Sequence, residues 1–183
     1  SNGNDGTFTA PFSTLDYAIG RCGASRGDVI FVKPGHAETL SAAAAIALDV
    51  AGVAVIGLGY GSLRPTFTLD TANTASITVS VANVALQNMI FVANFLAIPT
   101  LFDVSTATDF TVEHCEFRDT SATLNFINII DTNADANTAD GLYFCNNRIL
   151  SSSTTALTTA IEIDAAISRM TVNDNFYVGA VVN

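Results

Sequence analysis

The stretch FTVEHCEF (110–117) decides the fold, because its apolar and polar residues alternate and then change phase at Cys115. The same frame recurs in VALQNMIF (84–91), LYFCNNRI (142–149) and MTVNDNFY (170–177). In each copy apolar residues hold the first, third and eighth positions, and a small, polar or sulfur-containing residue holds the sixth. The copies begin 26, 32 and 28 residues apart, and a period of 20–50 residues indicates a repeat architecture.

Equivalent positions of the repeats are expected to stack as inward-facing ladders, as like residues do in solenoids. The predicted ladders are Val84, Phe110, Leu142 and Met170; Leu86, Val112, Phe144 and Val172; Met89, Cys115, Asn147 and Asn175; and Phe91, Phe117, Ile149 and Tyr177. The frame extends more loosely to VAVIGLGY (53–60) and IFVKPGHA (30–37), which aligns Ile30 with Val53 and places Tyr60 inward. Inward Asn147 and Asn175 are expected to satisfy backbone groups at a bend.

A second short alternating segment precedes most repeats. These segments are IALDV (46–50), ITVSV (77–81), LFDV (101–104), INII (127–130) and IEID (161–164). The polar insertion TNADANTAD (132–140) is expected to be a loop. The spacing is too short for propeller blades, and no leucine-rich consensus is present. The sequence therefore predicts an all-β, right-handed parallel β-helix of about five to six coils.

The segment FSTLDYAIGRC (12–22) shows helical periodicity, with Ser13 and Asp16 spaced as in a capping box. A solenoid needs its apolar ends covered, so this amphipathic helix is expected to cap one end and to bury Cys22. The predicted organisation is an N-terminal cap at 1–28 and a β-helix at 29–183. Its C-terminal end is expected to lack a cap.

Composition excludes several function classes. Hydrophobic residues make up 49% of the chain and charged residues 13%, and the net charge is −10 with 7 basic residues. Nucleic acids and anionic membranes would be repelled by this charge, so neither is an expected partner. The three cysteines, Cys22, Cys115 and Cys145, do not suggest a disulfide framework or zinc spacing, and no cofactor or metal is predicted.

Candidate catalytic residues are sparse. Asp103, Asn128 and Glu162 are expected to form an outward acidic column, with Asp164 further along. The outward residues of the repeat strand carry little chemistry: Ala54, Ala85, Thr111, Tyr143 and Thr171. Cys115 should point inward and His114 outward, so they are not expected to form a nucleophile–base pair.

The segments GNDGT (3–7) and GDVIFVKPG (27–35), with the helix between them, resemble the opening of pectate-lyase-like right-handed β-helix proteins. More narrowly, RPTFT (64–68), NMIFVAN (88–94) and CEFRDTSATL (115–124) resemble β-helix proteins encoded by tailed bacteriophages. The resemblance implies a location on the virion surface, or otherwise an extracellular one, and a homotrimer as the common arrangement.

The chain has few charged residues, and its outward strand positions carry little chemistry. Together with the resemblance to phage β-helix proteins, these features favour a non-enzymatic structural protein of a phage particle, such as a capsid decoration or fibre part. Its expected partners are copies of itself and other virion proteins. The alternative is a polysaccharide lyase or hydrolase, or a glycan-binding tailspike-type module, with Asp103, Glu162 and Asp164 as candidate catalytic residues. The absence of tryptophan weakens the alternative, because sugar grooves are lined by aromatic residues.

Overall fold

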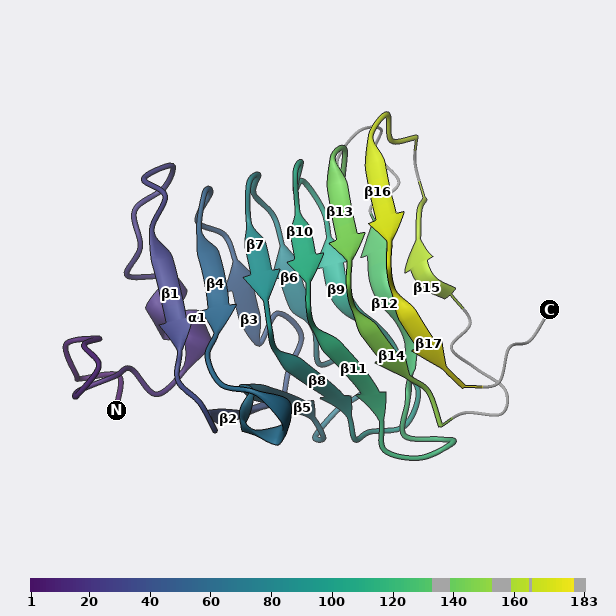
Figure 1. Cartoon of the computed structure of the whole chain (residues 1–183), viewed down its shortest axis with the longest axis horizontal. Coiled ribbons are helices and arrows are strands. Elements are labelled where there is room, and N and C mark those ends of the chain that lie inside the picture. The colour runs from purple at the N-terminus through teal and green to yellow at the C-terminus, as the bar shows by residue number, and fades with distance from the viewer. Residues whose placement is uncertain (133–138, 153–158, 165, 180–183) are drawn as a thin grey trace.

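The computed structural model describes residues 1–132, 139–152, 159–164 and 166–179. In this part of the chain, short strands wind into a parallel β-solenoid (Figure 1), which confirms the predicted fold class. Residues 133–138 of the predicted polar loop lie outside the described residues.

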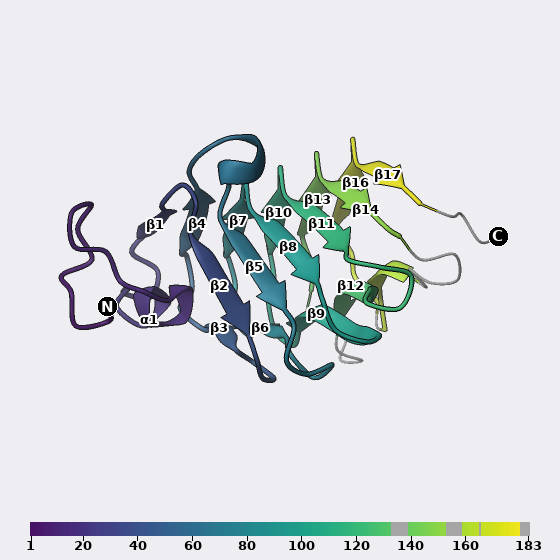
Figure 2. The ribbon, with the colours of Figure 1, turned by 90° about the horizontal axis from the view of Figure 1, so that it is seen from below.

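Each complete coil contributes one strand to each of three parallel sheets, which we call A, B and C. Among the described residues, sheet A contains β1 (Val29–Val32), β4 (Ala54–Gly57), β7 (Ala85–Gln87), β10 (Thr111–Glu113), β13 (Leu142–Cys145) and β16 (Met170–Asn173). Sheet B, seen face-on in Figure 2, contains β2 (Ala37–Leu40), β5 (Thr66–Leu69), β8 (Ile90–Ala93), β11 (Glu116–Asp119), β14 (Arg148–Leu150) and β17 (Phe176–Val178). Sheet C contains β3 (Ile46–Leu48), β6 (Ile77–Val79), β9 (Ile98–Val104), β12 (Phe126–Thr132) and β15 (Thr159–Glu162).

The strand register stacks equivalent residues of successive coils. Leu86, Val112, Phe144 and Val172 share one position of sheet A, and Leu142 lies opposite Met170. Phe91, Phe117, Ile149 and Tyr177 share one position of sheet B. In the last described coil, Met170 and Val172 keep this register but are 49% and 48% exposed, because no described strand pairs with the far side of β16.

Stacked phenylalanine rings fill the interior of the solenoid. The ring of Phe91 lies 5.6 Å from that of Phe67 and 5.5 Å from that of Phe117, and the three rings are nearly parallel. Phe102 contacts Phe91 edge-on from sheet C, at 5.3 Å. These rings bury large apolar areas, and their stacked and edge-on geometries add favourable electrostatic contacts.

The first coils depart from the predicted alignment. Tyr60 was expected inward but is 92% exposed, and Phe67 takes the position opposite Phe91. The reason is an insertion between β4 and β5, which contains the 3-10 helix η1 (Gly61–Leu63) and leaves the strand path. In the preceding coil Ile30 pairs with Val55 rather than Val53, a shift of two residues from the expected alignment.

The helix α1 (Leu15–Ile19) buries Leu15 and Ile19 in the core cluster. The predicted capping box is wrong, because the residue before the helix is Thr14 and no side chain of the expected motif caps it. Instead Glu38 of β2 accepts a hydrogen bond from the Leu15 amide at 2.9 Å. Asp16 turns toward sheet C and accepts a hydrogen bond from the Ala47 amide at 3.0 Å.

Candidate functional site

The outward face of sheet A is almost uncharged. One outward position is occupied by Val29, Ala54, Ala85, Thr111, Tyr143 and Thr171 in successive coils, and the next by Phe31, Ile56, Gln87, Glu113, Cys145 and Asn173. Glu113 is the single formal charge among these twelve residues, and Cys145 is the one residue among them that is buried, at 1% exposed. At the N-terminal end of the sheet, Phe31 is 61% exposed and Val29 is 47% exposed. Five of the twelve residues were predicted to point outward and to carry little chemistry. The second position, which begins with Phe31, adds to this face.

The outward face of sheet C is acidic, but its composition differs from the prediction. Asp103 pairs with Asp131, and Asp131 pairs with Glu162, whereas the expected member Asn128 pairs with Thr100. The difference arises because each strand buries two consecutive apolar residues in the core, Leu101 with Phe102 in β9 and Ile129 with Ile130 in β12, which shifts the alternation by one. Asn128 still contacts the column, because its amide nitrogen donates to the Glu162 carboxylate.

Asp131 is the functional candidate that the sequence pattern missed. Burial raises the pKa of its carboxyl above the ordinary range, and the nearby carboxylates Glu162, Asp164 and Asp103 raise it further. A hydrogen bond donated by Thr100, at 3.2 Å, opposes this shift. Within the described residues no group of three or more histidine, cysteine or acidic side chains could hold a metal ion.

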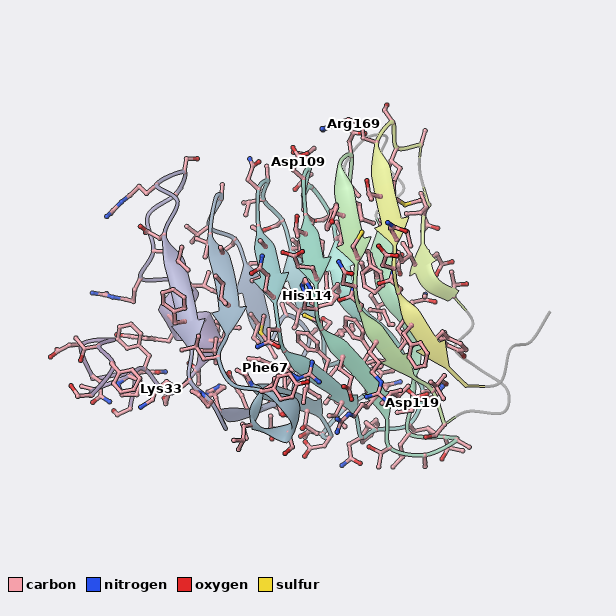
Figure 3. The ribbon with its side chains drawn as sticks, in the orientation of Figure 1. Lys33, Phe67, Asp109, His114, Asp119 and Arg169 are labelled. Atoms are coloured by element: carbon pink, nitrogen blue, oxygen red, sulfur yellow. The ribbon has the colours of Figure 1, made fainter. Side chains whose placement is uncertain are left out.

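Cys115 and His114 diverge from one another. Cys115 is 1% exposed, and burial raises the pKa of its thiol to about 12, so the thiolate is not populated at neutral pH. His114 adopts a left-handed backbone conformation at the bend between sheets A and B, and its side chain is 62% exposed (Figure 3). The geometry therefore provides no cysteine–histidine pair for nucleophilic catalysis.

A second charged cluster lies outside the bend between sheets A and B, and it was not predicted. Glu116 of β11 points outward, yet its side chain is only 3% exposed because Arg64 and Arg118 enclose it. Arg64 donates to the Glu116 carboxylate from Nη2 at 2.6 Å, and Arg118 donates from Nε to the other oxygen. Although desolvation raises the pKa of Glu116, the hydrogen bonds and charges of these arginines outweigh it, so the net shift is downward.

A further ion-pair network lies at another edge of the solenoid. Arg169 contacts Asp140 at 2.9 Å and Asp109 at 3.2 Å, and it links the segments that enter β13, β10 and β16 (Figure 3). Asp140 also accepts hydrogen bonds from the amides of Ser168 and Arg169. These contacts tie neighbouring coils together, and they pair the Arg169 guanidinium with two carboxylates.

The fold defines the class of the protein as a parallel β-solenoid. No protein-family model, curated protein or solved structure matched the chain. No helix in the described part of the chain is long and apolar enough to cross a membrane.

Proposed function

We propose that this chain is a non-enzymatic structural protein that acts by associating with further copies of itself. The observation that carries the proposal is the outward face of sheet A, where one of twelve side chains is charged and Phe31 and Val29 are exposed. Contiguous exposed apolar surface is typical of interaction sites.

Charge favours a second copy as the occupant of this face. With a net charge of −10, two copies repel one another over most of their surfaces. Close approach is least costly where side chains are neutral, and the outward face of sheet A is almost uncharged. Sheet C, with Asp103, Asp131 and Glu162 on its outer side, is the least favourable face for the same contact.

The setting that we propose is the surface of a tailed-bacteriophage particle, as a decoration or fibre component that also packs on other virion proteins. This part rests on the sequence resemblance of 64–68, 88–94 and 115–124, and the trimer is the arrangement which that resemblance implies.

Light scattering coupled to size-exclusion chromatography tests the association. The purified protein should elute as a defined oligomer, and Phe31→Glu should shift it toward monomer. Leu63→Glu is the matched control, because Leu63 is 62% exposed but lies on η1 and not on a strand of sheet A. A monomer at all concentrations, or equal effects of both variants, would contradict the proposal.

A carbohydrate-active enzyme is the second candidate, favoured by one observation. Asp131, whose carboxyl pKa is raised by burial, lies in register with Asp103 and Glu162. Glycoside hydrolysis uses a pair of carboxyl groups, of which the acid has a raised pKa. Reducing-end release from pectin, alginate or capsular polysaccharide, abolished in Glu162→Gln or Asp103→Asn, would favour this candidate over the structural one.

A further inference from the structure

Outside the bend between sheets A and B, a shallow hollow of about 410 Å³ gathers basic side chains from distant parts of the sequence. Its lining includes Arg64 from the η1 insertion, His114 from the bend, Arg118 from β11 and Arg148 from β14, with Tyr60 at the rim. Three of the seven basic residues of the chain thus meet at one place. Figure 3 locates the hollow by His114, which lies where β10 leads into β11.

Glu116 holds two of these arginines in place. Its carboxylate oxygens accept hydrogen bonds from Arg64 Nη2 and Arg118 Nε, and its side chain is almost fully buried. Arg64 is fixed further, because its Nε donates to the Gly61 carbonyl at 3.1 Å and its Nη1 to the His114 carbonyl at 3.4 Å. The guanidinium groups of Arg64 and Arg118 are therefore oriented before any ligand arrives, which lowers the entropic cost of binding.

The cluster holds more donors than its own carboxylate uses. Arg148 Nη1 lies 3.8 Å from Glu116, beyond hydrogen-bonding distance. Arg118 and Arg148 are 41% and 54% exposed, and Arg118 contacts Glu116 through Nε. Three arginines against one glutamate leave an excess of two positive charges, in a protein whose net charge is −10.

We propose that this hollow binds an oxyanion, meaning a carboxylate, sulfate or phosphate group of a ligand, through Arg118 and Arg148. Guanidinium groups match the planar or tetrahedral arrangement of such oxygens and bind them with paired, charge-assisted hydrogen bonds. Glu116 and Arg64 act as positioning residues. Tyr60 presents an exposed ring beside the arginines, which suits stacking on a sugar that carries the oxyanion. The site is independent of the proposed association through sheet A.

Two titrations of the 183-residue chain by NMR, at low ionic strength, test the proposal. The first probe is inorganic phosphate, and the second is a heparin-derived tetrasaccharide. We expect saturable shifts of the Asn88, His114 and Asn146 amides, which line the hollow, and weakening of at least about tenfold in Arg118→Gln/Arg148→Gln. The double variant Arg21→Gln/Arg26→Gln removes the same charge at the N-terminal side and should leave the affinity within about twofold.

The two probes distinguish the source of the oxyanion. Tighter binding of the tetrasaccharide that is lost in Tyr60→Ala assigns the site to an acidic glycan, and equal affinities assign it to free oxyanions. The proposal is overturned if neither probe gives saturable shifts at the hollow, or if both double variants weaken binding equally. It is also overturned if the arginine variant changes the oligomeric state while neither probe binds the wild type, because the cluster would then pair with carboxylates of a second copy.

Discussion

Asn147 and Asn175 lie at the same position of successive coils, and the side-chain oxygen of Asn175 accepts a hydrogen bond from the Asn147 amide at 2.9 Å. Asn147 repeats this contact on the coil before it, where its oxygen accepts from the Cys115 amide at 3.0 Å. The amide nitrogens complete the pattern, because Asn147 donates to Val112 and Asn175 to Phe144. Each asparagine thereby satisfies the backbone at the turn of the preceding coil, which secures the bend between sheets A and B.

Replacing Asn147 by alanine should destabilise the protein substantially. The change leaves the Cys115 amide and the Val112 carbonyl without their partner in a site where Asn147 is 1% exposed. A buried unsatisfied group costs about 1–3 kcal/mol, so we expect a loss of about 2–4 kcal/mol in the free energy of unfolding, measured in urea. Asn173→Ala, at an exposed position, should change it by less than about 0.5 kcal/mol. Equal effects would show that the ladder contributes nothing specific.

Gly57 should not tolerate a side chain. A Cβ at this position would lie 2.3 Å from the carbonyl oxygen of Asn88 on the next coil, so the coils would have to separate. We expect Gly57→Ala to lower the free energy of unfolding by about 1–3 kcal/mol, the usual cost of overpacking. The control is Gly20→Ala, where the nearest atom is 3.7 Å away and the backbone is helical. Thermal unfolding of both variants checks the difference, and a neutral Gly57→Ala would contradict the close approach.

Asp131→Asn should stabilise the protein at neutral pH. The pKa of Asp131 is raised in the folded state, so folding favours its protonated form and the ionised form costs stability. The gain from asparagine is expected to be a few tenths of a kcal/mol at pH 7. It should shrink as the pH falls through the raised pKa and vanish below the ordinary aspartate pKa of about 3.9. Urea unfolding at several pH values measures this, with the exposed Asp49→Asn as control; destabilisation at pH 7 would contradict it.

Glu116→Gln should have the opposite effect and lower the free energy of unfolding at neutral pH. The pKa of Glu116 is lowered in the folded state, so its stabilising contribution is fully present above the ordinary glutamate pKa of about 4.3 and is lost as the pH falls through the lowered value. Removing the charge leaves Arg64 and Arg118 side by side without their counter-charge, at a cost of about 1–3 kcal/mol near neutral pH.

The difference in the free energy of unfolding between Glu116→Gln and the wild type should therefore become smaller toward acidic pH. Glu113→Gln, on the exposed side of sheet A, serves as the control for loss of one carboxylate. A cost that stays constant from pH 7 to pH 3 would mean that Glu116 stabilises the bend by packing and not by its charge.

The sequence alone determined the parallel solenoid and the stacking of Leu86, Val112 and Phe144, because inward residues repeat with the strand period and each coil must bury them against the next. It also indicated that Cys115 would be an inert inward residue beside an exposed His114. Tertiary structure decided where the alternation breaks. Because of the η1 insertion, Phe67 and not Tyr60 takes the inward position beside Phe91. In β12, the consecutive buried residues Ile129 and Ile130 place Asp131 outward. It alone brought Arg64 to Glu116 across 52 residues and past the intervening coil, because contacts between coils depend on loop lengths and packing that no local pattern encodes.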